Sequence, residues 1–192
     1  MEGRFKKAAA AVDALLVTRR RSREAAVWQT LAARERLCEE LDRAVQAGGD
    51  ATAGEAAIAA AREQWAKLPE VSAGWEKQMT ARRDAASRAI GETALAGKHA
   101  ATIERNAVAR REILLELELL LGLDSPAALQ TQRLALQVRQ LKDRFSSAVT
   151  ASAETAGERL LAWCALAGGA DALDRQRCER IIARVGDARS TS

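Results

Sequence analysis

Clustered arginines are the residues of this sequence whose type and spacing could do chemistry, because a guanidinium group binds a phosphate or a carboxylate through two parallel hydrogen bonds. One cluster lies at residues 19–23, and pairs follow at 82–83 and 110–111. A charge cluster is also the ordinary pattern of a solvated helix face, and no glycine-rich phosphate loop accompanies these clusters. We expect exposed side chains that contact a phosphate or a partner: Arg19, Arg20, Arg21, Arg23, Arg82, Arg83, Arg110 and Arg111.

The histidine and the cysteines do not form a catalytic or metal-binding pattern. His99 is the single histidine and has no cysteine or carboxylate pair at ligand spacing, so we expect it at the surface. Cys38, Cys164 and Cys178 are too few and too scattered for a disulfide framework or a zinc site, which favours a cytoplasmic setting and small buried thiols. We therefore predict no enzyme activity, cofactor, metal or small-molecule substrate.

The composition predicts an all-α fold, an elongated array of long antiparallel helices without a sheet. The 192 residues include two prolines and no tyrosine, and they are rich in alanine, leucine, arginine and glutamate. The net charge of +4 comes with charges of both signs interspersed, which is weak evidence for a nucleic-acid partner. The densest apolar run, residues 113–123, is too short to span a bilayer and contains two glutamates, so no membrane partner is expected.

The stretch from Arg110 to Phe145 predicts the helical hairpin around which the chain is organised. Gly122 can end the first helix in a left-handed conformation, and Pro126 suits the first position of the second helix. Apolar residues of the first helix recur three and four residues apart, at Ile113, Leu114, Leu117, Leu120 and Leu121. The second helix has the spacing of a two-helix seam at Leu134, Val138, Leu141 and Phe145. We expect the two helices to pack side by side and antiparallel.

Glu118 is the carboxylate that we expect to face the packed side of this hairpin. Glu116 and Glu118 are two residues apart, which separates them by about 200° around a helix, so they cannot act as a paired acid and base on one face. A buried carboxylate needs a partner, and Arg133 or Gln137 across the turn are the expected ones. We interpret these residues as a structural polar network.

Glycine, proline and polar positions divide the rest of the chain. Residues 4–46 lack proline and glycine and predict one long helix or two helices with a polar joint. The polar segment 18–24 interrupts the apolar stripe and should project into water. Other helices are expected over residues 52–68, 72–121, 158–166 and 171–185, with Gly91, Gly97 or Asn106 as joints. The expected regions are a long helix and truncated repeat at 1–49, a repeat and the hairpin at 50–145, and a linker, terminal hairpin and disordered tail at 146–192.

The tryptophans indicate a degenerate helix-turn-helix repeat. We expect all four of them to fill gaps between helices and not to stack on unpaired bases. When Trp65 is aligned with Trp163, the further matches are Leu68 with Leu166, Trp75 with Leu173, Gln78 with Gln176, and Arg82 with Arg180. Tryptophan and leucine that recur at one spacing are what a repeated packing contact requires.

This repeat, followed by a long helix and by the segments LELELLLGLDSP and RLALQVRQL, resembles the bacterial domain-of-unknown-function 349 family. The resemblance covers most of the chain and is strongest over residues 117–141, at Glu118, Ser125-Pro126, Arg133 and Gln137-Val138. Two features depart from the family: within the repeat units phenylalanine follows arginine only at Phe5, with Arg83 and Ile181 at the matching positions, and members are usually longer, with further repeats ahead. The resemblance implies the C-terminal part of such a protein and a helical fold, and it implies no mechanism.

The sequence as a whole favours a cytoplasmic helical scaffold or interaction module over an enzyme. Extended apolar stripes predict that it binds protein partners or itself. The alternative is a nucleic-acid- or ribosome-associated binder that uses the exposed arginines, because phosphate contacts need such cations.

Overall fold

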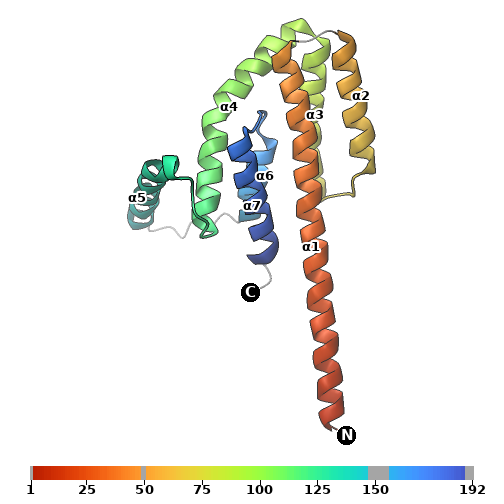
Figure 1. The fold of residues 1–192 in the computed structure, drawn as a ribbon, viewed down its shortest axis with the longest axis vertical. Coiled ribbons are helices and arrows are strands. Elements are labelled where there is room, and N and C mark those ends of the chain that lie inside the picture. The colour runs from red at the N-terminus through yellow and green to blue at the C-terminus, as the bar shows by residue number, and fades with distance from the viewer. Residues whose placement is uncertain (1, 49–50, 147–155, 189–192) are drawn as a thin grey trace.

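The computed structural model shows an all-α protein, as the composition predicts (Figure 1). The structure describes residues 2–48, 51–146 and 156–188, and the side chains of a few residues inside the helices near the N-terminus and around residue 145 are also left undescribed. No strand occurs in the described part of the chain. The expected fold class is therefore confirmed.

Glycine and proline positions mark the ends of the first helices. α1 spans Glu2–Ala47 and ends at Gly48, whose φ of 59° lies in the left-handed region. α2 spans Ala51–Lys67 and stops before Pro69. α3 spans Ala73–Gly91 and α4 spans Thr93–Leu120, so of the three expected joints the chain breaks at Gly91, while Gly97 and Asn106 lie inside α4.

The turn after α4 has the expected glycine but not the expected proline position. Gly122 adopts φ 66°, and the N–H of Leu123 donates to the carbonyl of Glu118 at 2.8 Å, which closes the last helical turn. Pro126 precedes a 3-10 turn, η1, at Ala127–Leu129, and α5 begins only afterwards, at Gln130–Ser146. The prediction of proline at the first position of α5 is wrong. α6 spans Ala156–Ala165 and α7 spans Ala172–Ala188, so α7 reaches into the tail that we expected to be disordered, and the rest of that tail lies outside the described residues.

The core of the molecule lies between the C-terminal half of α1 and helices α3, α4, α6 and α7. α1 packs against α2, α3, α4 and α7, and α6 packs against α3 and α4. Three tryptophans are buried in this core, and Trp75 is half-buried with its ring centroid 4.9 Å from that of Trp28. The cysteines are buried and free, and burial raises the pKa of the Cys38 thiol to about 12. The packing interpretation of both residue types is confirmed.

The expected repeat is visible at the turns and is lost in the helices that follow. The N–H of Leu68 donates to the carbonyl of Trp65 at 3.1 Å, and the N–H of Leu166 donates to that of Trp163 at 3.3 Å. α2 then packs against α3, whereas α6 and α7 make their main contacts with α3, α4 and α1. Arg82 is buried, but the aligned Arg180 is exposed.

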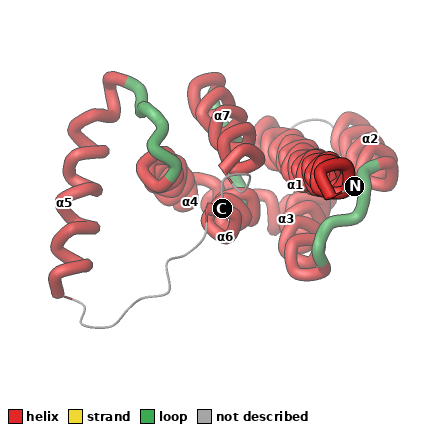
Figure 2. Tube along the Cα trace, turned by 90° about the horizontal axis from the view of Figure 1, so that it is seen from below, coloured by secondary structure: helices red, strands yellow, loops and turns green. Residues whose placement is uncertain are grey.

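Two segments leave this bundle. Residues 2–26, which we call the α1 arm, extend beyond the other helices (Figure 1), and the described side chains at positions 11–19 are all exposed. The described side chains of the polar segment 18–24 are exposed as expected, and the structure adds that the apolar residues before this segment project into water as well. α5 contacts α4 and otherwise stands apart from the bundle (Figure 2). Leu134, Val138 and Leu141 are exposed and Phe145 lies among the side chains not described, so the predicted α4–α5 seam is wrong.

Candidate functional site

A buried network of charges holds the loop between α6 and α7, residues 166–171, against the bundle. Arg82 of α3 donates from Nε and Nη2 to Asp42 Oδ2 of α1, at 3.0 and 2.8 Å. The same guanidinium donates to the carbonyls of Cys164 and Gly168, at 2.5 and 2.9 Å. Arg82 therefore joins three segments that are far apart in the sequence.

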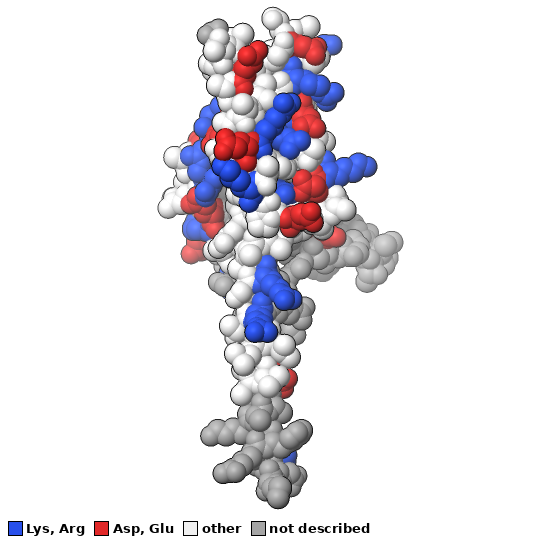
Figure 3. Space-filling model, turned by 90° about the vertical axis from the view of Figure 1, so that its right-hand side faces the viewer, with Lys and Arg blue, Asp and Glu red and all other residues white. Residues whose placement is uncertain are grey.

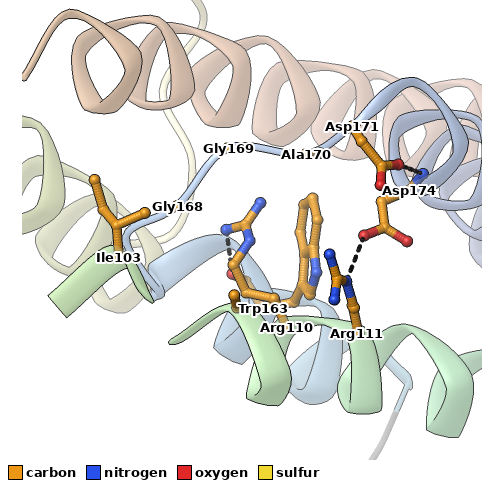
Figure 4. Close-up of a pocket in the computed structure, with 10 residues that line it drawn as sticks. Ile103, Arg110, Arg111, Trp163, Gly168, Gly169, Ala170, Asp171 and Asp174 are labelled. Carbon is orange, nitrogen blue, oxygen red and sulfur yellow. Dashed lines mark hydrogen bonds and ion pairs between the residues drawn. The ribbon is translucent and has the colours of Figure 1, made fainter. Parts of the chain in front are cut away.

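Arg110 of α4 also joins this loop to α1. Its Nη2 donates to Glu35 Oε1 at 2.9 Å, and its Nη1 donates to the carbonyls of Leu166 and Trp163 at 2.6 and 3.2 Å. The guanidinium lies over the Trp163 ring, 3.9 Å from the centroid (Figure 4). A Cβ at Gly168 would come within 2.9 Å of the Arg110 side chain, so glycine leaves the space that the arginine needs.

The carboxylates of this network come from one face of α1. Glu35, Glu39 and Asp42 are spaced by four and three residues and therefore point the same way. Asp42 Oδ2 accepts the N–H of Gly168 at 2.8 Å, and Glu39 Oε1 accepts that of Ala170 at 2.8 Å. Burial opposes ionisation of Asp42, but the hydrogen bond from His99 and the charge of Arg82 outweigh it, so the pKa of this carboxyl lies below its usual range.

His99 belongs to this network as well, and the expectation of a surface histidine is wrong. Its Nε2 lies 2.7 Å from Asp42 Oδ1, and its side chain is 10% exposed. The contact joins residues 57 positions apart, so no local spacing in the sequence indicated it.

The structure does not gather the eight predicted arginines into one phosphate site. Arg82 and Arg110 are each 4% exposed, which corrects the prediction that they contact a phosphate or a partner. Arg83 lies over the Trp65 ring at 4.7 Å and pairs with Asp84, and Arg111 is exposed and 3.8 Å from Asp174. In the cluster at 19–23 Arg19 and Arg23 are exposed, while the side chains of Arg20 and Arg21 are not described.

Glu118 is committed to the structure, as predicted, but its partner is a different one. The carboxylate is fully buried and receives Nε and Nη2 of Arg177 from α7 at 2.8 and 3.0 Å. Ser125 Oγ donates to Glu118 Oε2 at 2.6 Å, and Arg133 Nη1 donates to that Oγ at 2.6 Å. Arg133 is therefore linked to Glu118 through Ser125, and the side chain of Gln137 is exposed.

A small hollow of about 130 Å³ lies beside the same loop (Figure 4). It is lined by Arg110, Arg111, Trp163 and Asp174, among others. The Arg110 guanidinium is already bound by Glu35 and by two carbonyls, so its role is to fix the loop. Among the described residues no group of three or more histidine, cysteine or acidic side chains is placed to hold a metal ion.

Two apolar stripes stand out among the exposed side chains that the structure describes. On the α1 arm Val12, Leu15 and Leu16 are between 54% and 63% exposed, and we call them the α1 stripe. On α5 Leu134, Val138 and Leu141 are between 43% and 62% exposed, and we call them the α5 stripe. Figure 3 shows charges of both signs over the bundle, and on the projecting arm a mostly uncharged surface with a group of basic side chains.

Comparison with known proteins adds no relative to these observations: no family model, curated protein or solved structure matches the chain. The resemblance to the domain-of-unknown-function 349 family stays a prediction. Within the described part of the chain no helix combines the length and the apolar character needed to cross a membrane.

Proposed function

We propose that this protein is a helical interaction module whose bundle supports two apolar stripes for binding protein partners. The observation that carries the proposal is the exposure of the α1 and α5 stripes on helices that project from the bundle. Exposed apolar side chains at helical spacing are the surface that a partner helix or groove covers.

The magnitude of apolar burial favours a partner that makes further contacts. Complete burial of a fully exposed valine or leucine side chain contributes about 1.5 to 3 kcal/mol, and the stripe residues are about half exposed, so one three-residue stripe supplies roughly 2 to 5 kcal/mol. Association itself costs about 4 to 15 kcal/mol in lost freedom, so one stripe alone would give weak binding. A stable complex needs charge complementarity or both stripes as well.

The buried network gives the bundle the rigidity that such a support requires. Asp42 and Glu39 hold the 166–171 loop from α1, and Arg82 and Arg110 hold it from α3 and α4. α1 is one continuous helix from Glu2 to Ala47, so the arm continues directly from this fixed part. The charged residues of the network thus support the binding surface and do not form it.

Site-specific photo-crosslinking in the native cells tests the proposal. A photo-reactive amino acid replaces Leu16 in one variant, Leu141 in another and, as a control, Val108, which is exposed on α4 outside both stripes. We expect discrete protein adducts from position 16 or 141 and none from position 108. Equal labelling at all three positions, or no protein adduct, would contradict it.

The same experiment addresses a nucleic-acid-binding function. Arg19 and Arg23 remain available for phosphate contacts, whereas Arg82 and Arg110 are buried. The crosslinking is repeated in a lysate of the same cells, where adducts that disappear after nuclease treatment before crosslinking would favour the nucleic-acid alternative. Adducts that persist after it would support a direct protein partner.

A further inference from the structure

The α1 arm carries the whole net charge of the chain. Residues 2–26 contain seven lysines and arginines against three aspartates and glutamates, a net charge of +4, and the complete chain also has a net charge of +4. The remaining residues are therefore neutral overall, with 23 charges of each sign. The part of the molecule that projects from the bundle is the basic part.

Charge and apolar surface lie on one face of this arm. Val12, Leu16, Arg19 and Arg23 follow each other at intervals of four, three and four residues, which places them along a single stripe of the helix. All four side chains are exposed. This face is apolar at its outer end and cationic where it approaches the bundle.

A second copy of the chain does not complement such a face. Two arms side by side bring +4 against +4 in either direction. A parallel pair places the two arginine clusters against each other, and an antiparallel pair centred on Val12 places the cluster opposite residues 1–5, which include Arg4 and adjoin Lys6 and Lys7. Like charges across an interface suppress association, so the arm disfavours its own copies.

A protein helix fits the arm better than a lipid surface or a nucleic acid does. The stretch before Val12 is four alanines, Ala8 to Ala11, whose small side chains let a second helix approach closely. Helices that bind lipid surfaces instead present large apolar side chains such as tryptophan and phenylalanine, and Phe5 is the single aromatic residue of the arm. Phosphate contacts would leave the α1 stripe uncovered.

We infer that the α1 arm binds an acidic protein helix, whose facing side is apolar opposite Val12 and Leu16 and carries aspartate or glutamate opposite Arg19 and Arg23. This inference rests on the proposed function and names the chemistry of the partner. Complementary charges beside an apolar seam are the means by which paired helices select their partners.

Two synthetic helical peptides with the same leucine seam test the inference, one with glutamate and the other with lysine at the positions flanking the seam. Binding to the full chain is measured by fluorescence anisotropy at low and at high salt. We expect the glutamate peptide to bind at least about tenfold more tightly at low salt, and the difference to shrink as salt screens the charges. Arg19→Glu/Arg23→Glu should reverse the preference, so that the lysine peptide binds more tightly. Val12→Ser/Leu16→Ser should weaken the binding of both peptides.

Arg62→Glu/Arg88→Glu is the matched control, because it changes the net charge equally at exposed positions on α2 and α3. It should leave the preference for the glutamate peptide in place. Equal binding of both peptides, an equal effect of the control, or a dimer in sedimentation at low salt would overturn the inference. Stronger binding to phosphatidylserine vesicles than to the peptide would overturn it in favour of a lipid surface. Photo-crosslinks from Leu16 that persist alongside any of these results would leave the proposed function standing.

Discussion

At the residue scale, the molecule uses charged side chains inside its core. Glu35, Glu39, Asp42 and Glu118 are all buried, and each accepts hydrogen bonds from a guanidinium group or a backbone N–H. A buried charge is tolerated when it is paired in this way. Removing one partner leaves the other charge buried without a counter-charge or water. Single substitutions of these residues should therefore lower the free energy of unfolding more than typical surface substitutions do.

Glu118→Ala should destabilise the protein by about 1 to 3 kcal/mol, because Nε and Nη2 of the buried Arg177 lose their acceptor while Nη1 keeps Asp174. Urea unfolding followed by circular dichroism measures the loss. Glu116→Ala is the control, since Glu116 pairs with the more exposed Arg159 and Arg139 and should cost under about 1 kcal/mol. Similar losses in the two variants would show that the α4–α7 contact does not hold the fold together.

Acidification should destabilise the folded state through Asp42. Its pKa is lowered on folding, so its contribution is complete above the unfolded pKa of about 3.9 and is lost as the pH falls through the lower folded value. Urea midpoints measured from neutral pH down to strongly acidic pH should therefore decline below about pH 4. Asp42→Asn should lower stability at neutral pH and flatten that decline. A decline as steep in Asp42→Asn as in the natural chain would exclude Asp42 as its source.

The sequence did not indicate which of the arginines are buried. Arg82 is followed by Arg83, and Arg110 is followed by Arg111. A pair of adjacent arginines does not by itself indicate which of the two is buried. The acidic face of α1, at positions 35, 39 and 42, was the available signal that a buried guanidinium lay opposite. The carbonyl partners of Arg82 come from Cys164 in α6 and Gly168 in the loop, 82 and 86 residues away, which no local pattern specifies.

At the scale of the elements, glycine positions and apolar spacing predicted where the helices lie in the sequence, but they did not predict which helices pack against each other. Gly48, Gly91 and Gly122 lie at helix ends, and at Gly48 and Gly122 the backbone is left-handed, a conformation that favours glycine. The spacing of Leu134, Val138 and Leu141 predicted an amphipathic helix correctly, but an apolar stripe does not state which surface covers it. α5 presents this stripe to solvent and buries Leu136 instead.

Gly122→Ala should destabilise the protein by about 1 to 2 kcal/mol, because alanine is strained at φ 66°. Gly97→Ala provides the opposite case: it lies in α4 with open space around its Cβ position, and alanine should stabilise the helix by about 0.5 to 1 kcal/mol. Thermal unfolding of both variants compares them. A Gly122→Ala variant that is as stable as the natural chain would mean that the left-handed turn after α4 is not required.

At the scale of the whole molecule, the bundle carries the stability and the arm does not. Val12→Ser/Leu16→Ser should change the free energy of unfolding by less than about 0.5 kcal/mol, because both side chains are exposed. Leu31→Ala, in the buried half of the same helix, should cost about 2 to 5 kcal/mol. Chemical denaturation distinguishes the two halves of α1. A large loss in the arm variant would mean that the arm packs against the chain in solution.

The loop at residues 166–171 also sets the order in which the chain can reach its native state. The hydrogen bond from the Gly168 N–H to Asp42 spans 126 residues, and Arg82 and Arg110 need carbonyls from the same late segment. A ribosome synthesises the chain from its N-terminus, so α1 to α4 emerge before the loop carbonyl and N–H groups that hydrogen-bond to their charged side chains. Contacts this distant in sequence slow folding, and we expect the nascent bundle to stay hydrated between α1, α3 and α4 until α6 and the loop dock.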